Sequence, residues 1–261
     1  MLLQLHEWGD SGAPPVVCVH GVNAHGRRFR RLAEERLAKR FRVLAPDLRG
    51  HGGSQWDPPW TIATHVHDLL ETLDNEGLQS AQWVGHSFGG RLVLELAALA
   101  PNRIERAALL DPAIQVLPHV AFDFAERERA DRAYDDPEEP IQERLVADAS
   151  TPREYLEEDN RDHLVQHNDG KFRFRYAQAA VVSMYAELAT PPPSPETLRV
   201  PTLLLYSPAF GLVRRSQLEE YQHALGDRLE LVEVPGGHIV YWDSYDETGD
   251  AVERFLQDPG A

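Results

Sequence analysis

One serine lies in a glycine-rich turn of the pattern Gly-x-Ser-x-Gly, residues 85–89, GHSFG. An apolar run of strand length precedes the turn, and residues 91–100, which follow it, have helical spacing. A sharp turn between strand and helix lifts the serine hydroxyl out of the sheet. Glycines are needed there because side chains would collide with neighbouring backbone. The sequence therefore predicts that Ser87 is a nucleophile able to attack a carbonyl carbon.

Two backbone N–H groups are candidates for holding the oxyanion that such an attack creates. A helix that begins after Ser87 leaves unpaired N–H groups in its first turn, so Phe88 supplies the first candidate donor. Val22 supplies the second, within the segment HGVN at residues 20–23, which follows another apolar run. Adjacent parallel strands end at the same edge of a sheet, so the two donors are expected to meet there.

His238 has the position that a general base requires. It follows two glycines after the last apolar run and precedes the last predicted helix. Serine first and histidine last is one of the chain orders in which such catalytic groups occur. We therefore expect His238 to take the Ser87 proton; a solvated loop histidine is the alternative.

Short apolar runs alternate with segments of helical spacing, as in a mostly parallel α/β sheet covered by helices on both faces. The predicted strands are residues 16–20, 41–45, 81–85, 106–110, 202–206 and 229–234, with an edge strand at 2–8. The predicted helices are residues 27–39, 61–74, 88–100, 215–225 and 246–257. The pattern predicts a doubly wound sheet whose strand ends carry the reactive residues.

The alternation stops between the strand that ends at residue 110 and the one that starts at residue 202. Highly charged amphipathic stretches fill the gap, and the extended linker TPPPSP closes it at residues 190–195. We predict one core domain, residues 1–112 and 196–261, with a helical cap inserted at residues 113–195. Its aromatic residues either line a pocket or pack the cap against the sheet: Phe122, Phe124, Tyr155, Tyr176 and Tyr185.

Charge and composition exclude several classes of partner. The formal net charge is −16, from 42 acidic and 26 basic residues, so nucleic-acid backbones and anionic membrane surfaces would be repelled. No leader peptide and no apolar stretch of the roughly 20 residues that span a bilayer is present, which favours a cytoplasmic location. The single cysteine, Cys18, lies in an apolar run and is predicted to be a buried packing residue.

Together with the Ser87 turn and His238, the segment His20-Gly21 and residues 47–54, DLRGHGGS, make the chain resemble the α/β-hydrolase superfamily. The specific resemblance is to its capped esterase, lactonase and C–C hydrolase branch, and it covers nearly the whole chain. It implies an eight-stranded or slightly truncated sheet, a cap over the site, and hydrolysis of an ester-like bond without a cofactor. The expected substrates are small uncharged or weakly polar esters, with lactones and C–C bonds as alternatives. Asp47 and His51 are then scaffold residues, and no oligomeric state follows.

The chain departs from these relatives at the acid that orients the histidine. They usually carry an aspartate soon after the strand equivalent to residues 202–206, but residues 207–213 read SPAFGLV here, with Phe210 near that place. The acid has either moved or been lost. Asp111, directly after the strand at 106–110, is the best replacement, because neighbouring strand ends open onto one crevice. A lost acid would instead indicate a non-catalytic binding protein.

Two histidine pairs have no clear third ligand: His65 with His67 on a predicted helix, and His163 with His167, four residues apart in the cap. We predict solvated helix faces for them and no metal site. The aromatic loop around Trp56 and Trp60 is expected to pack the cap against the sheet rather than line an acyl pocket.

Overall fold

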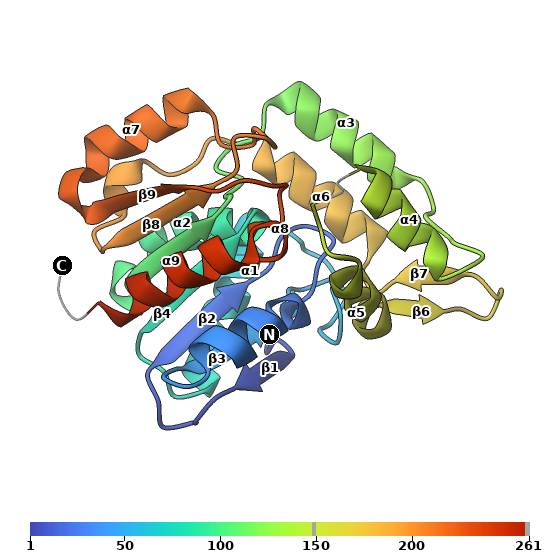
Figure 1. Cartoon of the computed structure of the whole chain (residues 1–261), viewed down its shortest axis with the longest axis horizontal. Helices are drawn as coiled ribbons and strands as arrows, with labels where there is room; N and C mark the ends of the chain where they lie inside the picture. Colours follow the sequence, from blue (N-terminus) through green and yellow to red (C-terminus); the bar gives the residue numbers. More distant parts are fainter. Residues whose placement is uncertain (148–149, 259–261) are drawn as a thin grey trace.

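A computed structural model describes residues 1–147 and 150–258 of the chain. Its core is a seven-stranded sheet in the order β1-β3-β2-β4-β5-β8-β9 (Figure 1). The strands are β1 Leu5–Trp8, β2 Pro15–Val19, β3 Arg42–Pro46, β4 Ala81–His86, β5 Ile104–Leu110, β8 Thr202–Tyr206 and β9 Leu229–Glu233. Only β1 runs antiparallel to its neighbour, β3, among the pairs in this sheet. All seven predicted strands are present, and the mostly parallel sheet is confirmed.

Alternating side chains of the strands belong to two hydrophobic layers, one on each face of the sheet. In β2, Val16 and Cys18 pack into one layer, whereas Val17 and Val19 pack into the other. Cys18 is fully buried, as predicted. The helix α9, Tyr245–Gln257, covers the first face with the short helices that follow β2. The second face is covered by α1 Ile62–Asn75, α2 Phe88–Leu99 and α7 Arg215–Leu225.

The predicted helix at residues 27–39 is the least regular of the predicted elements. It is a 3₁₀ turn, η1 Gly26–Phe29, followed by a π-helical segment, η2 Leu32–Leu37. Phe29, Leu32 and Leu37 are nevertheless fully buried. The apolar residues whose spacing suggested a helix therefore still pack into the hydrophobic layer on the first face of the sheet. The last helix is preceded by an extra short helix, α8 Val240–Asp243. None of the helices within the described residues has the length and hydropathy needed to cross a bilayer.

Between β5 and β8 the chain leaves the sheet and builds a separate group of elements beside it (Figure 1). They are α3 Pro118–Arg129, α4 Glu138–Ala147, α5 Arg153–His163, β6 Leu164–Gln166, β7 Phe172–Phe174 and α6 Gln178–Leu188. We call this part the β5–β8 segment. It is not purely helical, because β6 and β7 pair as a short antiparallel hairpin. Strands of three residues each are too short to leave a recognisable alternation in the sequence.

Arg91 holds both ends of the β5–β8 segment. This α2 side chain is almost fully buried, and its guanidinium donates to the Ile114 carbonyl at one end and to the Thr190 and Pro191 carbonyls at the other. A second buried contact lies farther out, where Arg28 donates two hydrogen bonds of 2.8 and 2.7 Å to the Asp159 carboxylate of α5. The segment is therefore tied to the core by charged hydrogen bonds, which are stronger than neutral ones.

Candidate active site

Ser87 sits at the turn between β4 and α2 with φ 54° and ψ −116°. Glycine is required on both sides of it. A Cβ on Gly85 would come within 2.6 Å of the Gly89 carbonyl oxygen, and one on Gly89 within 2.0 Å of the Val19 carbonyl oxygen. The turn is held by the Ser87 N–H, which donates to the Leu110 carbonyl at 3.1 Å. The serine is thus fixed at the carboxyl end of the sheet in the strained geometry that the motif predicts.

Ser87, His238 and Asp111 form one hydrogen-bonded chain. His238 Nε2 lies 2.9 Å from Ser87 Oγ, and His238 Nδ1 lies 2.6 Å from Asp111 Oδ2. Since a carboxylate only accepts, Nδ1 carries the proton and Nε2 presents a lone pair to the serine hydroxyl. The structure brings together the three residues that were selected from different parts of the sequence. The carboxylate comes from the end of β5, not from the loop after β8.

Three non-glycine residues have positive φ angles in the described part of the chain: Asn23 at 49°, Ser87 at 54° and Asp111 at 40°. Each follows a central parallel strand, β2, β4 or β5, at the same edge of the sheet. Such backbone conformations are costly for residues with a Cβ and concentrate where the surroundings impose them. Within the described residues, the positive φ angles of non-glycine residues are therefore gathered at one edge of the sheet.

The turn after β2 approaches the serine closely. A Cβ built on Gly21 would lie 3.0 Å from Ser87 Cβ and 3.4 Å from Ser87 Oγ, so only backbone fits there. Buried His20 fixes the turn, because its Nε2 accepts from the Leu48 N–H at 2.9 Å and its Nδ1 donates to the Gly21 carbonyl at 2.7 Å. This arrangement brings the turn that contains Val22 to the cavity beside Ser87, after which α2 begins at Phe88.

Two residues to which the sequence assigned no contact with the histidine hold it in place. His86 Nε2 donates to the His238 carbonyl at 2.9 Å, which steadies the loop before α8. Phe210, about half exposed, stacks flat on the His238 ring with 4.4 Å between centroids and 17° between planes. In the sequence, His86 is the residue before Ser87, and Phe210 stands where relatives usually carry the aspartate. Neither position shows by itself that the side chain contacts His238.

Burial shifts the titration of the Asp111–His238 pair. It raises the pKa of Asp111 to about 7, although the N–H of Ser207, 3.3 Å from Oδ1, opposes the rise. Burial also lowers the pKa of His238, and the positive charges of Arg144 and Arg28 lower it further. Because the two side chains share one short hydrogen bond, the proton taken up near neutral pH belongs to the pair. The pair therefore offers an unprotonated Nε2 to Ser87 from about pH 7 upward.

The site opens into a cavity of about 460 Å³ lined by the core and by the β5–β8 segment. One part of the wall is apolar: Ala113, Val116, Phe124, Leu188 and Leu212. Another part is polar: Arg28, Arg132, Tyr134, Glu143, Arg144, Asp159 and Asn160. Such a wall matches an amphipathic small molecule.

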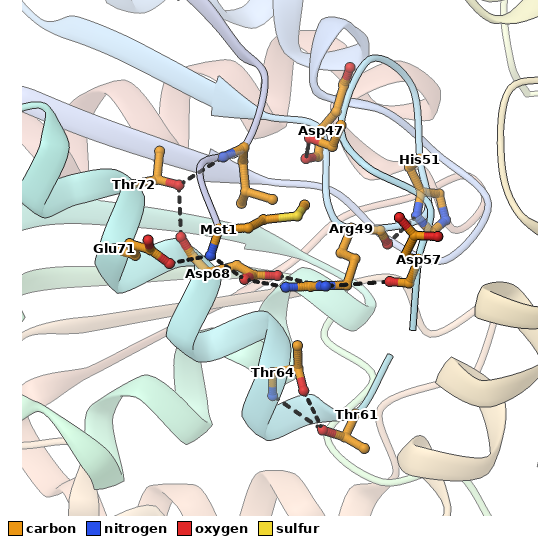
Figure 2. A network of polar contacts seen from close by, with 12 residues as sticks. Met1, Asp47, Arg49, His51, Asp57, Thr61, Thr64, Asp68, Glu71 and Thr72 are labelled. Carbon is orange, nitrogen blue, oxygen red and sulfur yellow. Dashed lines mark hydrogen bonds and ion pairs between the residues drawn. The ribbon is translucent and has the colours of Figure 1, made fainter. Parts of the chain in front are cut away.

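The loop after β3 is held by a network of polar contacts that reaches α1 (Figure 2). Asp47 accepts from the N–H groups of Gly26 and Gly53 at 2.8 and 2.9 Å, and these contacts, with His6, lower its pKa. Arg49 donates to both oxygens of Asp68 in α1, at 2.7 and 2.8 Å. Neither Asp47 nor buried His51 is hydrogen-bonded to the Ser87–His238–Asp111 chain. Their contacts are those of scaffold residues.

The prediction that the paired histidines lie on solvated faces was wrong for two of them. His65 and His163 are fully buried, whereas His67 and His167 are exposed. His163 is the last residue of α5 and stacks on His25 at 4.4 Å between ring centroids, which accounts for its burial. His65 packs edge-on against Phe88. No group of three or more potential ligand side chains suited to a metal ion occurs in the described residues.

The aromatic residues of the β5–β8 segment divide between the two expected roles. Phe124, Tyr176 and Tyr185 line the cavity. Tyr155 is buried against Trp242, and Phe122 is exposed. Neither Trp56 nor Trp60 is among the residues that line the cavity; Trp56 is exposed, and Trp60 lies close to Gly50. This agrees with the expectation that these tryptophans do not form the acyl pocket.

A family model described as alpha/beta hydrolase fold matches residues 14–245. The match covers most of the chain, including the ends of β2, β4, β5 and β8. The protein therefore belongs to the α/β hydrolase family.

Individual proteins are also similar to this chain over most of its length. The chain is similar to "Lipase LipV" of Mycobacterium tuberculosis, with 34% identity over 248 residues, which cover 92% of this chain and 93% of the lipase. It is 29% identical to "sn-1-specific diacylglycerol lipase ABHD11" of Mus musculus, covering 95% and 82% of the two chains. A solved structure of "E-2-(Acetamidomethylene)succinate Hydrolase" shares the fold with a TM-score of 0.89 and 22% identity, covering 98% and 95%. The named relatives support a hydrolase.

Proposed function

We propose that this protein is a serine hydrolase that cleaves small carboxylic esters through an acyl-enzyme intermediate. The observation that carries the proposal is the hydrogen-bonded chain from Ser87 through His238 to Asp111 at the cavity wall. The two lipase relatives, similar over more than four-fifths of both chains, support ester bonds as the target. The β5–β8 segment then acts as a cap that shapes the substrate pocket.

The chemistry follows from the positions of the donors and acceptors. His238 Nε2 takes the proton of Ser87 Oγ as the oxygen attacks the ester carbonyl, and Asp111 stabilises the imidazolium that forms. The N–H groups of Val22 and Phe88 hold the oxyanion. The imidazolium then gives its proton to the leaving alcohol oxygen when the C–O bond breaks. A water molecule, deprotonated by the same nitrogen, then attacks the acyl carbon. The bond between the acyl carbon and Ser87 Oγ breaks, the imidazolium returns the proton to Oγ, and the acid is released.

Labelling with a fluorophosphonate tests the nucleophile directly. We expect wild-type protein to be labelled at Ser87 and the Ser87→Ala variant to remain unlabelled, together with a loss of p-nitrophenyl butyrate hydrolysis of at least about 10³-fold. Ser216→Ala, which changes an exposed serine of α7, is the matched control and should label like the wild type. A folded wild-type protein that resists labelling would indicate a binding protein instead.

A further inference from the structure

Most polar side chains in the cavity wall are already paired within the protein. Arg28 is bound to Asp159 through both carboxylate oxygens, and Arg132 to Glu143 at 2.9 Å. Tyr134 donates to the same Glu143 carboxylate at 3.2 Å. Groups paired in this way lose existing hydrogen bonds when they turn to a ligand, so they make poor primary contacts for a neutral substrate.

Asn23 differs from these side chains. It lines the cavity and is partly exposed, and its carboxamide makes no hydrogen bond with any residue in the described ranges. The hydroxyl of Tyr185 is the other lining group of this kind, but the Tyr185 ring stacks on Phe124 at 5.4 Å, which is reason enough for its place in the wall. No comparable packing contact accounts for the Asn23 amide.

The position of Asn23 places it beside the reacting atoms. It directly follows Val22, the proposed oxyanion donor, in the turn whose backbone at Gly21 is packed against Ser87. Its φ of 49° lies in the left-handed region, which asparagine tolerates better than most residues. The left-handed backbone conformation alone could explain an asparagine at this position. Glycine would adopt the same conformation equally well, so the conformation does not explain why an amide is present. An amide at the cavity wall that is hydrogen-bonded to none of the described residues is available to a substrate.

We infer that the Asn23 carboxamide hydrogen-bonds an oxygen of the substrate that lies beside the scissile ester group. This inference rests on the proposed function, and it narrows the substrate class to esters that carry an ether, hydroxyl or carbonyl oxygen close to the bond that breaks. An amide NH₂ donates to such an oxygen. An alkyl chain at the same place leaves the amide desolvated and unpaired, which a hydrogen-bonding site penalises.

Two pairs of isosteric esters probe the acyl side and the alcohol side separately. On the acyl side, p-nitrophenyl methoxyacetate replaces one methylene of p-nitrophenyl butyrate by oxygen. On the alcohol side, 2-methoxyethyl butyrate does the same for butyl butyrate. The measured quantity is the ratio of kcat/KM for the oxygen-containing ester to that for its alkyl partner. Dividing the wild-type ratio by that of a variant cancels the intrinsic reactivity of the esters.

Asn23→Gly keeps the backbone conformation and removes the amide, whereas Asn23→Asp keeps the shape and removes the donor. We expect both variants to lower the ratio by about 5–10-fold on at least one of the two sides, as the loss of one hydrogen bond implies. Asn102→Gly, exposed and at the opposite end of the sheet, is the matched control and should leave the ratio unchanged. If both ratios stay at the wild-type value in folded Asn23→Gly, the inference is overturned.

Binding without turnover separates this inference from the proposed function. Calorimetry with 2-methoxyethyl butyrate and butyl butyrate is run on Ser87→Ala and on Ser87→Ala/Asn23→Gly. A preference for the oxygen-containing ester that the second substitution abolishes supports the Asn23 contact, even if the wild type hydrolyses neither ester. Ser87-dependent hydrolysis combined with no Asn23-dependent preference in either assay retains the enzyme and rejects the contact.

Discussion

The ends of β5 and β8 face the same histidine with opposite chemistry. At the end of β5, Asp111 is fully buried and its carboxylate lies 2.6 Å from His238 Nδ1, in reach of the ring's own N–H. At the end of β8, Phe210 is about half exposed and lies flat against the face of the same ring. One strand end supplies a polar contact to the edge of the imidazole, and the other an apolar contact to its face.

This difference shows what an orienting acid must provide. The Nδ1–H needs one buried acceptor at its edge, and a single strand end suffices to supply it. Once Asp111 fills that role, the loop after β8 is free to become part of the cavity wall, which Phe210 and Leu212 line. Under the proposed function, the acid has moved from the end of β8 to the end of β5, and the loop after β8 contributes wall surface instead.

The largest expected effect is at the β5 end. Asp111→Asn should lower kcat by roughly 10³–10⁴-fold, with KM changed only a few-fold, because the histidine loses its fixed tautomer and the charge that stabilises its protonated form. Steady-state kinetics with p-nitrophenyl butyrate measures the change, with exposed Asp227→Asn as the control. Wild-type turnover in Asp111→Asn would remove this residue from the mechanism.

The same substitution should change the pH dependence of the remaining activity. In the wild type, kcat/KM should fall as the pH drops below about 7, because the Asp111–His238 pair takes up a proton there and Nε2 can no longer act as a base. Asparagine does not titrate, and burial lowers the pKa of His238 itself. The acid limb of Asp111→Asn should therefore lie at least about one pH unit lower. An unmoved limb in a profile from pH 5 to 9 would refute this assignment.

The contact at the β8 end should matter less. Phe210→Ala removes the ring from the face of His238, and we expect kcat/KM to fall about threefold to tenfold, since aromatic pairs of this kind contribute about 0.5–1.5 kcal/mol. Phe210→Tyr should restore most of the activity. Phe122→Ala, also an exposed phenylalanine but not part of the cavity wall, serves as the control. Equal losses in Phe210→Ala and the control would show that the stacked ring has no specific role.

The smallest effect is electrostatic. The Arg144 charge disfavours the protonated form of His238, so neutralising it in Arg144→Gln should make the pair bind its proton more tightly. The acid limb of kcat/KM should then move to higher pH by about half a unit. Arg153→Gln, which removes an exposed arginine paired with Glu138, should leave the limb in place. A shift to lower pH would contradict the assigned direction.

Much of the fold could be predicted because its signals are local. Apolar runs of strand length, helical spacing and the glycines around Ser87 each follow from steric and hydrophobic rules that act over a few residues. His238 and Asp111 were found because parallel strands end at one edge of the sheet, so topology brings distant residues together.

The rest of the site depends on contacts that leave no periodic pattern. Phe210 was noted only because it stands where relatives usually carry an aspartate. Its stacking on His238 depends on how the loops after β8 and β9 meet in space. Burial of His65 and His163 runs against the usual preference of histidine helix faces for solvent, and each is explained only by an aromatic neighbour from another element. His86 acts through a backbone carbonyl 152 residues farther along the chain.

The Arg91 contact also bears on which substitutions the ends of the β5–β8 segment can tolerate. Its acceptors at residues 114, 190 and 191 include a backbone carbonyl on each, and every amino acid carries such a carbonyl. Side-chain substitutions at these three positions would therefore leave the carbonyl acceptors of the Arg91 guanidinium in place. The attachment of the β5–β8 segment to α2 depends mostly on the path of the backbone at its two ends.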